Sequence, residues 1–80
     1  MSINTLCNGL RKKGLDARIV TVHNYNGSGH DAPGIMVYHD YDGLYPSRDA
    51  LHACDIAEAY ATRNGYNAEH RGHYTATLIY

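Results

Sequence analysis

Residues 17–41 read ARIVTVHNYNGSGHDAPGIMVYHDY, and this stretch decides the fold. Two β-rich runs, residues 17–25 and 34–41, flank the segment NGSGHDAP at 26–33, which consists of turn-forming residues. Parallel strands need a connection of roughly a dozen residues or more, whereas this connection has the length of a hairpin loop. The sequence therefore predicts an antiparallel hairpin near the middle of the chain.

A helix is predicted before the hairpin. Ser2 is suited to cap a helix over residues 3–13, and Gly14 can adopt the left-handed conformation that ends it. The apolar residues of this segment have the spacing of one buried stripe: Ile3, Leu6, Cys7 and Leu10.

A second helix is predicted after the hairpin, over residues 47–63. Ser47 is its expected N-cap, and Asn64-Gly65 forms a stop signal. Its apolar stripe consists mostly of small residues: Ala50, Ala53, Cys54, Ala57, Tyr60 and Ala61. Small side chains let a helix lie close to a sheet. The alternation in residues 73–80 predicts a last strand, and residues 66–71 either extend that strand or pair with it around Gly72.

Together these elements predict one small α+β domain over residues 1–80, in the order α-β-β-α-β(β). Its simplest arrangement is an antiparallel sheet of three to four strands with two helices on one face. The other face is then wholly or partly open. An uncovered sheet face or edge is a docking surface, and an exposed edge also permits a homodimer.

Length and charge exclude several functions. The chain has 80 residues, 7 Lys plus Arg, 8 Asp plus Glu and a net charge of −1, so a nucleic-acid interface is not expected. The basic run Arg11–Lys13 lies at the end of the first helix, where cations suit the helix dipole. Residues 1–15 carry no long apolar run and no segment is apolar enough to span a membrane, so a cytoplasmic location with Cys7 and Cys54 as free thiols is expected.

Six histidines raise the question of a metal site. His70 and His73 have a chelating spacing for a helix but fall in an expected turn or strand, and His23 and His39 could face each other across the hairpin. A structural zinc site needs about four protein ligands, and no cysteine pair completes such a set. No metal site is predicted.

Enzyme signatures are equally weak. Cys54 could pair with His52 or His39, but a cysteine in the middle of a helix and among alanines is expected to be buried and inert. Asp40 and Asp42 form a carboxylate pair without a placed third group. The segment NGSG lacks the lysine and helix of a phosphate loop. We therefore expect no catalytic residue, no cofactor and no enzymatic activity.

The tyrosine content is the feature of the sequence that indicates a function, namely protein binding. The chain has eight tyrosines and neither phenylalanine nor tryptophan, and tyrosine is enriched at protein interfaces. In VYHDYDGLY, residues 37–45, alternation places Val37 and His39 on the core side and Tyr38 on the open side. The predicted partner-binding residues, suited to receive arginines of another protein, are Tyr38, Asp40, Tyr41, Asp42 and Tyr45. The alternative is a merely solvated strand end.

In size and style the chain resembles the small phage-encoded anti-CRISPR proteins, which share no residue motif. The resemblance rests on a single α+β unit without enzyme or export signature, and on tyrosine and aspartate displayed together. It implies an inhibitor acting in the bacterial host cytoplasm, which binds a host protein or ribonucleoprotein complex such as a CRISPR-Cas effector and occludes a functional surface. The alternative function is a regulatory or nucleic-acid-associated module that uses Arg11–Lys13 and Arg18.

Overall fold

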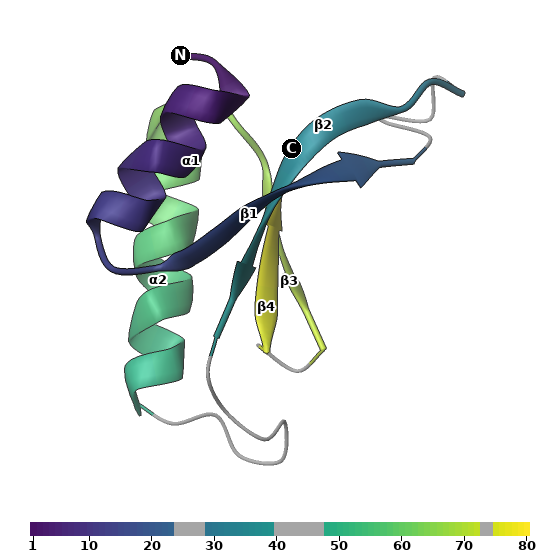
Figure 1. The fold of residues 1–80 in the computed structure, drawn as a ribbon. Helices are drawn as coiled ribbons and strands as arrows, with labels where there is room; N and C mark the ends of the chain where they lie inside the picture. The colour runs from purple at the N-terminus through teal and green to yellow at the C-terminus, as the bar shows by residue number, and fades with distance from the viewer. Residues whose placement is uncertain (24–28, 40–47, 73–74) are drawn as a thin grey trace.

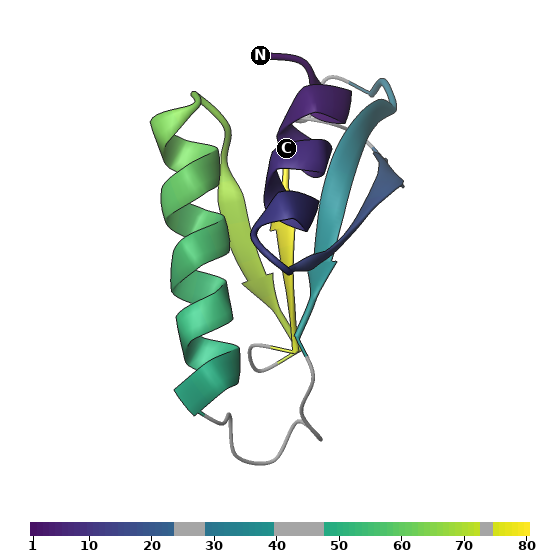
Figure 2. The same ribbon diagram turned by 60° about the vertical axis from the view of Figure 1, so that its left-hand side comes forward.

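A computed structural model describes residues 1–23, 29–39, 48–72 and 75–80 of the chain. The elements are α1 (Ile3–Lys12), β1 (Asp16–Val22), β2 (Ala32–Tyr38), α2 (Arg48–Arg63), β3 (Ala68–Arg71) and β4 (Ala76–Ile79). The four strands form one antiparallel sheet in the order β1-β2-β4-β3. Both helices lie on the same face of this sheet and run antiparallel to each other (Figures 1 and 2). The predicted α+β class and the two-layer arrangement are confirmed.

Both ends of α1 and the C-terminal end of α2 follow the capping chemistry of the sequence, whereas the predicted N-cap of α2, Ser47, lies outside the described residues. The Ser2 hydroxyl accepts a hydrogen bond of 3.2 Å from the amide of Thr5, and this satisfies one free donor of the first turn. Gly14 and Gly65 have φ of +86° and +84°, so each takes the left-handed conformation that ends a helix. Both predicted helix stops are confirmed.

The strands are shorter than the β-rich runs. β1 covers residues 16–22, whereas the predicted segment was 17–25. β2 covers residues 32–38, whereas the predicted segment was 34–41. Among the described residues of the expected strand 73–80, the strand covers Ala76–Ile79, and Ala68–Arg71 forms a separate strand, β3. Gly72, with φ of +56°, lies in the turn between them. Of the two alternatives for residues 66–71, pairing with the last strand is the correct one.

The core lies between the helices and one face of the sheet. Alternation along the strands puts these buried residues toward the helices: Ala17, Ile35, Val37, Thr77 and Ile79. α1 contributes Leu6, Cys7 and Leu10, and α2 contributes Cys54, Ala57 and Ala61, each at most 2% exposed. The large side chains therefore come from α1 and the strands, while the small residues of α2 let that helix lie close to them, as predicted.

Two glycines allow close approaches that position these layers. A Cβ on Gly9 of α1 would collide with the ring and hydroxyl of Tyr60 on α2, so glycine lets the two helices pack through that ring. A Cβ on Gly34 would lie 2.8 Å from the Ile79 carbonyl oxygen and 2.5 Å from Val22. Gly34 therefore permits the β1–β2 hairpin to cross the end of β4.

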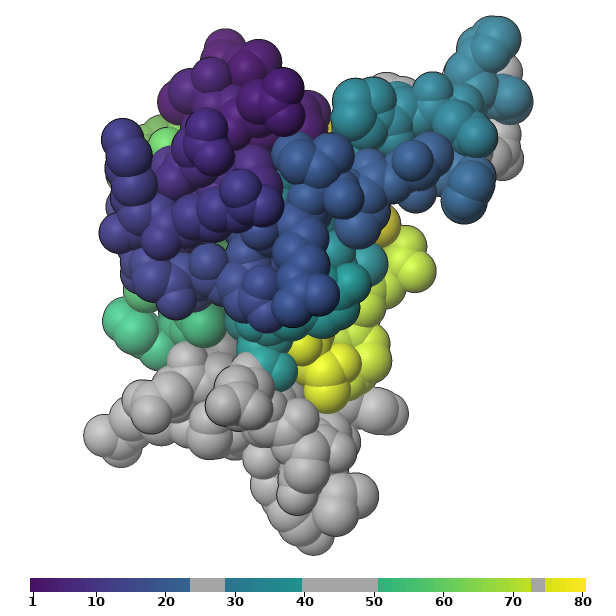
Figure 3. Space-filling model, in the orientation of Figure 1, coloured from purple at the N-terminus to yellow at the C-terminus, as the bar shows by residue number. Residues whose placement is uncertain are grey.

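The β1–β2 hairpin extends beyond the rest of the sheet. β4 pairs with β2 from Ile35 to Tyr38, whereas residues 32–34 of β2 pair with residues 20–22 of β1 alone. We call residues 20–22 and 32–34 the arm. Figures 1 and 3 show the arm projecting from the molecule on the side away from the helices. This part of the sheet consists of only two strands.

Candidate functional site

An exposed tyrosine stands on the sheet face that carries no helix. Tyr38 is 44% exposed, which makes it one of the few large apolar side chains on the described surface. The guanidinium carbon of Arg18 lies 5.0 Å from the centroid of its ring, a cation–π arrangement. Arg18 is in turn paired with Asp16, with Nε to Oδ1 at 3.1 Å and Nη2 to Oδ2 at 3.2 Å. These contacts hold an exposed aromatic ring in a defined position.

The sheet register explains why these three side chains meet. Asp16 is directly opposite Tyr38 across the β1–β2 pair, and Arg18 is two residues further along β1 on the same face. The Arg18 guanidinium carries a permanent positive charge, and the hydrogen bond with Asp16 raises its pKa further. An aromatic ring between a fixed cation and solvent is suited to packing against another protein.

Around Tyr38 the surface is partly apolar. Met36 and Leu78 are opposite each other on β2 and β4, and Leu78 is only 7% exposed. We call this surface the open face and define it by Arg18, Val20, Met36, Tyr38, Ala76 and Leu78. Ala76 and Leu78 are buried, at 8% and 7% exposure, so the accessible side chains of this face are those of the other four residues. The ion pair between Arg71 and Glu69, 3.2 Å, borders it on β3. An apolar centre with charged groups at its margin is the composition of a protein interface.

The structure describes one of the five predicted partner-binding residues. Tyr38 lies on the helix-free face, and its neighbours Val37 and His39 are buried, so the predicted alternation is correct from 37 to 39. The other four predicted residues, Asp40, Tyr41, Asp42 and Tyr45, lie outside the described residues. Arg18 and Met36 were not predicted to accompany Tyr38, because a cross-strand neighbour depends on the register of the hairpin.

A second polar cluster is buried on the opposite, helix-covered face. His39 is 6% exposed, and its Nε2 lies 2.8 Å from the hydroxyl of Thr77, which is fully buried. The Nδ1 atom of His70 lies 3.2 Å from the same hydroxyl, and His70 Nε2 lies 3.0 Å from a carboxylate oxygen of Glu58 on α2. A continuous chain of hydrogen bonds thus joins β2, β4, β3 and α2.

Only one neutral proton arrangement satisfies this chain. The Glu58 carboxylate must accept, so His70 carries its proton on Nε2 and accepts from the Thr77 hydroxyl through Nδ1. The Thr77 oxygen then accepts from Nε2–H of His39. This leaves His39 Nδ1 as a buried acceptor with no partner among the described residues. Burial, and to a smaller degree the neighbouring His70, lowers the pKa of His39, so this ring is neutral at neutral pH.

The thiol of Cys54 borders the same cluster. Cys54 is 2% exposed on α2. Burial raises the pKa of its thiol, while a hydrogen bond with Thr77 acts in the opposite direction to a smaller extent. A buried thiol with a raised pKa is a poor nucleophile, because the thiolate is the reactive form.

His23 and His39, which the sequence allowed to face each other across the hairpin, do not form a pair. His23 is exposed and its Nδ1 lies 3.3 Å from Asp31, whereas His39 is buried against Thr77. The register places Val22 opposite Ala32 and Asp16 opposite Tyr38, so His23 and His39 are at opposite ends of the hairpin. Within the residues that the structure describes, no group of three or more His, Cys, Asp or Glu side chains is placed to hold a metal ion.

Three of the basic residues named for the alternative function, Arg11, Lys13 and Arg18, have contacts within the fold. Arg11 donates from Nε to the Ala17 carbonyl at 2.9 Å, and the Lys13 ammonium lies 5.0 Å from the Tyr60 ring centroid. Arg18 pairs with Asp16. Arg11 and Lys13 thus connect α1 to β1 and to α2, while Arg18 pairs within β1.

Comparison with known proteins identified no related protein. The chain matches no protein-family model, no curated protein and no solved structure at a significant level. Neither of the helices has both the length and the apolar content needed to span a membrane, as far as the described residues extend. The interpretation of the site therefore rests on its geometry and chemistry.

Proposed function

We propose that this protein is a non-enzymatic binding protein that covers a functional surface of a larger protein complex with its open face. One observation carries the proposal: an exposed aromatic ring, Tyr38, is fixed by Arg18 and Asp16 beside the apolar Met36 and Leu78. Aromatic anchors contribute much of the free energy of protein interfaces, and holding them in place before binding lowers the entropic cost. The aromatic ring of α2, Tyr60, also lies beside cations, Lys13 and Arg63, but it is less exposed than Tyr38 and packs against α1.

The partner surface should carry arginine beside apolar groups. Tyr38 leads directly into the segment that contains Asp40 and Asp42, so the sequence supplies carboxylates next to the anchored ring. Arginine pairs with carboxylates through two parallel hydrogen bonds and stacks on aromatic rings. The complementary surface is therefore a basic patch on a protein, which nucleic-acid-binding complexes commonly possess.

The finer proposal is an inhibitor encoded by a phage or another mobile element, which acts in the bacterial cytoplasm on a host defence complex such as a CRISPR-Cas effector. Its support is the resemblance in size, charge and displayed residues to anti-CRISPR proteins. The test is the plating efficiency of a targeted phage on strains that carry different CRISPR-Cas types, with and without this protein. Restored plating on one type is expected; unchanged plating on every type contradicts the finer proposal alone.

The general proposal has its own experiment. Tagged protein is used to capture partners from bacterial lysate, and the recovered partner is then titrated in purified form. We expect the Tyr38→Ala variant and the Asp40→Lys/Asp42→Lys double variant to weaken this binding at least tenfold. Leu51→Ala is the matched control, because Leu51 is a large apolar residue of similar exposure, 41%, on α2.

Two results would contradict the general proposal. One is a partner that binds the Tyr38→Ala variant as tightly as the wild type. The other is equal weakening by Tyr38→Ala and Leu51→Ala, which would indicate that binding does not depend on the open face. Circular dichroism of each variant verifies that the fold is retained.

A further inference from the structure

The free edge of β1 is a self-complementary surface. His39 donates its amide to the Thr75 carbonyl at 2.8 Å, so the odd-numbered residues of β2 bond toward β4. In an antiparallel ladder a residue forms both of its backbone bonds on one side, and its sequence neighbours bond on the other. The even-numbered residues of β2 therefore bond to β1, through their partners Asp16, Arg18, Val20 and Val22. The backbone groups of Ala17, Ile19 and Thr21 point away from the sheet.

Ala17 is already satisfied within the chain. Its carbonyl accepts from Arg11 Nε at 2.9 Å and its amide donates to the Leu15 carbonyl at 3.1 Å. The amides and carbonyls of Ile19 and Thr21 thus constitute the open part of this edge: two donors and two acceptors, two residues apart. The edge is aliphatic here, because residues 19–22 are Ile, Val, Thr and Val. Unprotected edges of this kind pair with further strands.

We propose that β1 pairs antiparallel with β1 of a second copy of this chain, about a twofold axis that passes between the two Val20 residues. In this register Ile19 of each copy is opposite Thr21 of the other, and the pair exchanges both backbone hydrogen bonds. Four hydrogen bonds form, and they use all four open groups of each copy. The two four-stranded sheets thereby become one continuous eight-stranded sheet.

Other twofold registers fit less well. An axis at Arg18 places two guanidinium groups opposite each other, and like charges in that position are destabilising. Axes at Arg18 or Ile19 also require the backbone of Ala17, which is occupied. An axis at Thr21 pairs Ile19 with residue 23, beyond the end of β1. The register about Val20 instead places Arg18 opposite Val22, with no like charges opposed.

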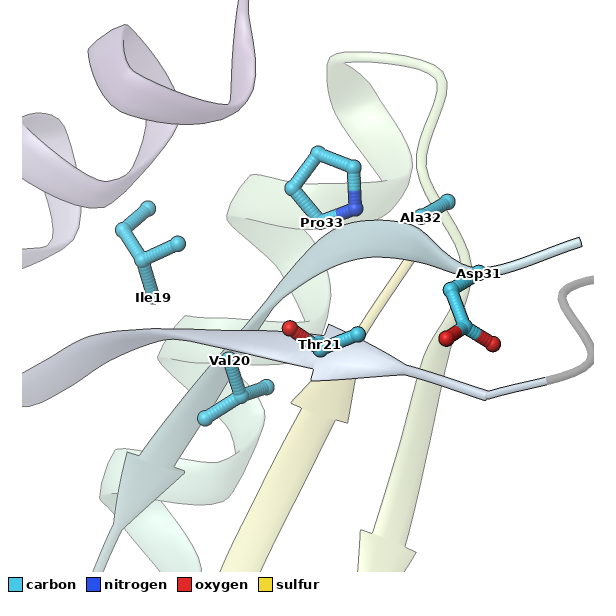
Figure 4. A pocket seen from close by; sticks show the side chains of 6 residues that line it. All are labelled: Ile19, Val20, Thr21, Asp31, Ala32 and Pro33. Atoms are coloured by element: carbon cyan, nitrogen blue, oxygen red, sulfur yellow. The ribbon is translucent and has the colours of Figure 1, made fainter.

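The side chains favour the same register. Ile19 is 43% exposed, although it lies on the face of the sheet that the helices otherwise cover. Ile19 lines a shallow hollow together with Asp31 and residues of the arm, including Thr21 and Pro33, which are opposite each other (Figure 4). In the proposed pair, Ile19 of one copy lies beside Thr21 of the other and reaches this hollow. Symmetry buries both isoleucines. Figure 3 shows β1 at the surface along its length.

Disulfide trapping tests the register. Val20 forms a non-hydrogen-bonded pair with itself, whose Cα separation of about 4.5 Å is within the range of a disulfide. We expect the Val20→Cys variant to form covalent dimers on mild oxidation at least tenfold faster than the Arg18→Cys variant. The wild-type protein is the negative control for cross-linking, because its own cysteines, Cys7 and Cys54, are buried. Equal rates for the two variants, or faster cross-linking of Arg18→Cys, would overturn the proposal.

Sedimentation equilibrium tests the edge itself. A proline at position 21 removes an outward amide and no bond to β2, so Thr21→Pro should weaken dimerisation at least tenfold and retain the circular dichroism spectrum, whereas Thr21→Val should still dimerise. A wild-type protein that remains monomeric at millimolar concentration would overturn the proposal. A second result would also overturn it: a wild-type protein that is monomeric and binds a foreign protein, with that binding lost in the Thr21→Pro variant. The edge of β1 would then pair with another chain and not with a second copy. These results are independent of Tyr38 and of the proposed function.

Discussion

The helix-covered face and the open face of the sheet use the same strands but differ in what their polar groups contact. On the covered face, His39, Thr77, His70 and Glu58 bond to one another. On the open face, Asp16 and Arg18 bond to each other and leave the ring of Tyr38 exposed. Buried polar groups must be satisfied internally, so the first set contributes to the fold, whereas the second set orders a surface. Substitutions on the two faces should therefore affect different measurements.

The largest effect on stability is expected at the aliphatic centre of the covered face. Leu10 is fully buried between α1 and the sheet, and Leu10→Ala should lower the free energy of unfolding by about 2–5 kcal/mol, because it removes buried apolar area and leaves a cavity. Urea denaturation followed by circular dichroism measures this. Leu51→Ala, at an exposed leucine of α2, should change the same quantity by less than about 0.5 kcal/mol. Similar losses for both would contradict the assignment of the core.

The next largest effect is expected at the centre of the polar chain. Thr77→Val keeps the shape of the side chain but removes the hydroxyl that joins His39 to His70, and should cost about 1–3 kcal/mol of unfolding free energy. Thr62→Val is the matched control, since the Thr62 hydroxyl bonds to a helix carbonyl in an exposed position. A Thr77→Val protein as stable as the wild type would show that the chain of hydrogen bonds contributes nothing to stability.

The covered face should also make stability depend on pH. Because burial lowers the pKa of His39 below its ordinary value of 6.5, the unfolded chain takes up a proton there before the folded chain does. The contribution of neutral His39 is therefore complete above pH 6.5 and decreases as the pH falls below it, by at most about 1.4 kcal/mol per pH unit. Thermal melts from pH 8 to 5 measure it. The decrease should be shallower in His39→Gln and unchanged in His23→Gln, at an exposed histidine; parallel curves for all three proteins would contradict this origin.

The smallest effect on stability is expected on the open face. Tyr38→Ala removes a half-exposed ring and its cation–π contact with Arg18, and should cost no more than about 1 kcal/mol. Chemical denaturation compares it with Thr77→Val on the same scale. A loss of several kcal/mol would mean that Tyr38 is part of the core and would remove the basis for treating it as a binding residue.

Local signals in the sequence predicted the elements, but not every partner across them. Ser2, Gly14 and Gly65 indicated where helices begin or end, and alternation from Val37 to His39 indicated which side chains are buried. These properties depend on neighbours within a few residues. For β3 the sequence offers two alternatives, because a four-residue strand carrying charges has little apolar periodicity to identify it.

The sequence pattern could not predict contacts between residues that are far apart in the chain. Thr77 meets His39 across 38 positions of sequence, and nothing in either segment indicates the other. The contact between Arg18 and Tyr38 was not predictable either, because it depends on the register of the hairpin. The pairing of His23 with His39, which the sequence left possible, does not form for this reason: the loop length predicted a hairpin, but not which residues are opposite each other. Of the predicted binding residues, Tyr38 alone is placed by the described residues.

The most direct test of the open face as the binding surface is an NMR titration of isotopically labelled protein with the captured partner. We expect the largest changes in the signals of Met36, Tyr38 and Leu78, while those of Leu51 and other exposed positions on α2 remain at their free values. Changes concentrated on α2, with Met36, Tyr38 and Leu78 unaffected, would contradict the central claim that the helix-free face contacts the partner.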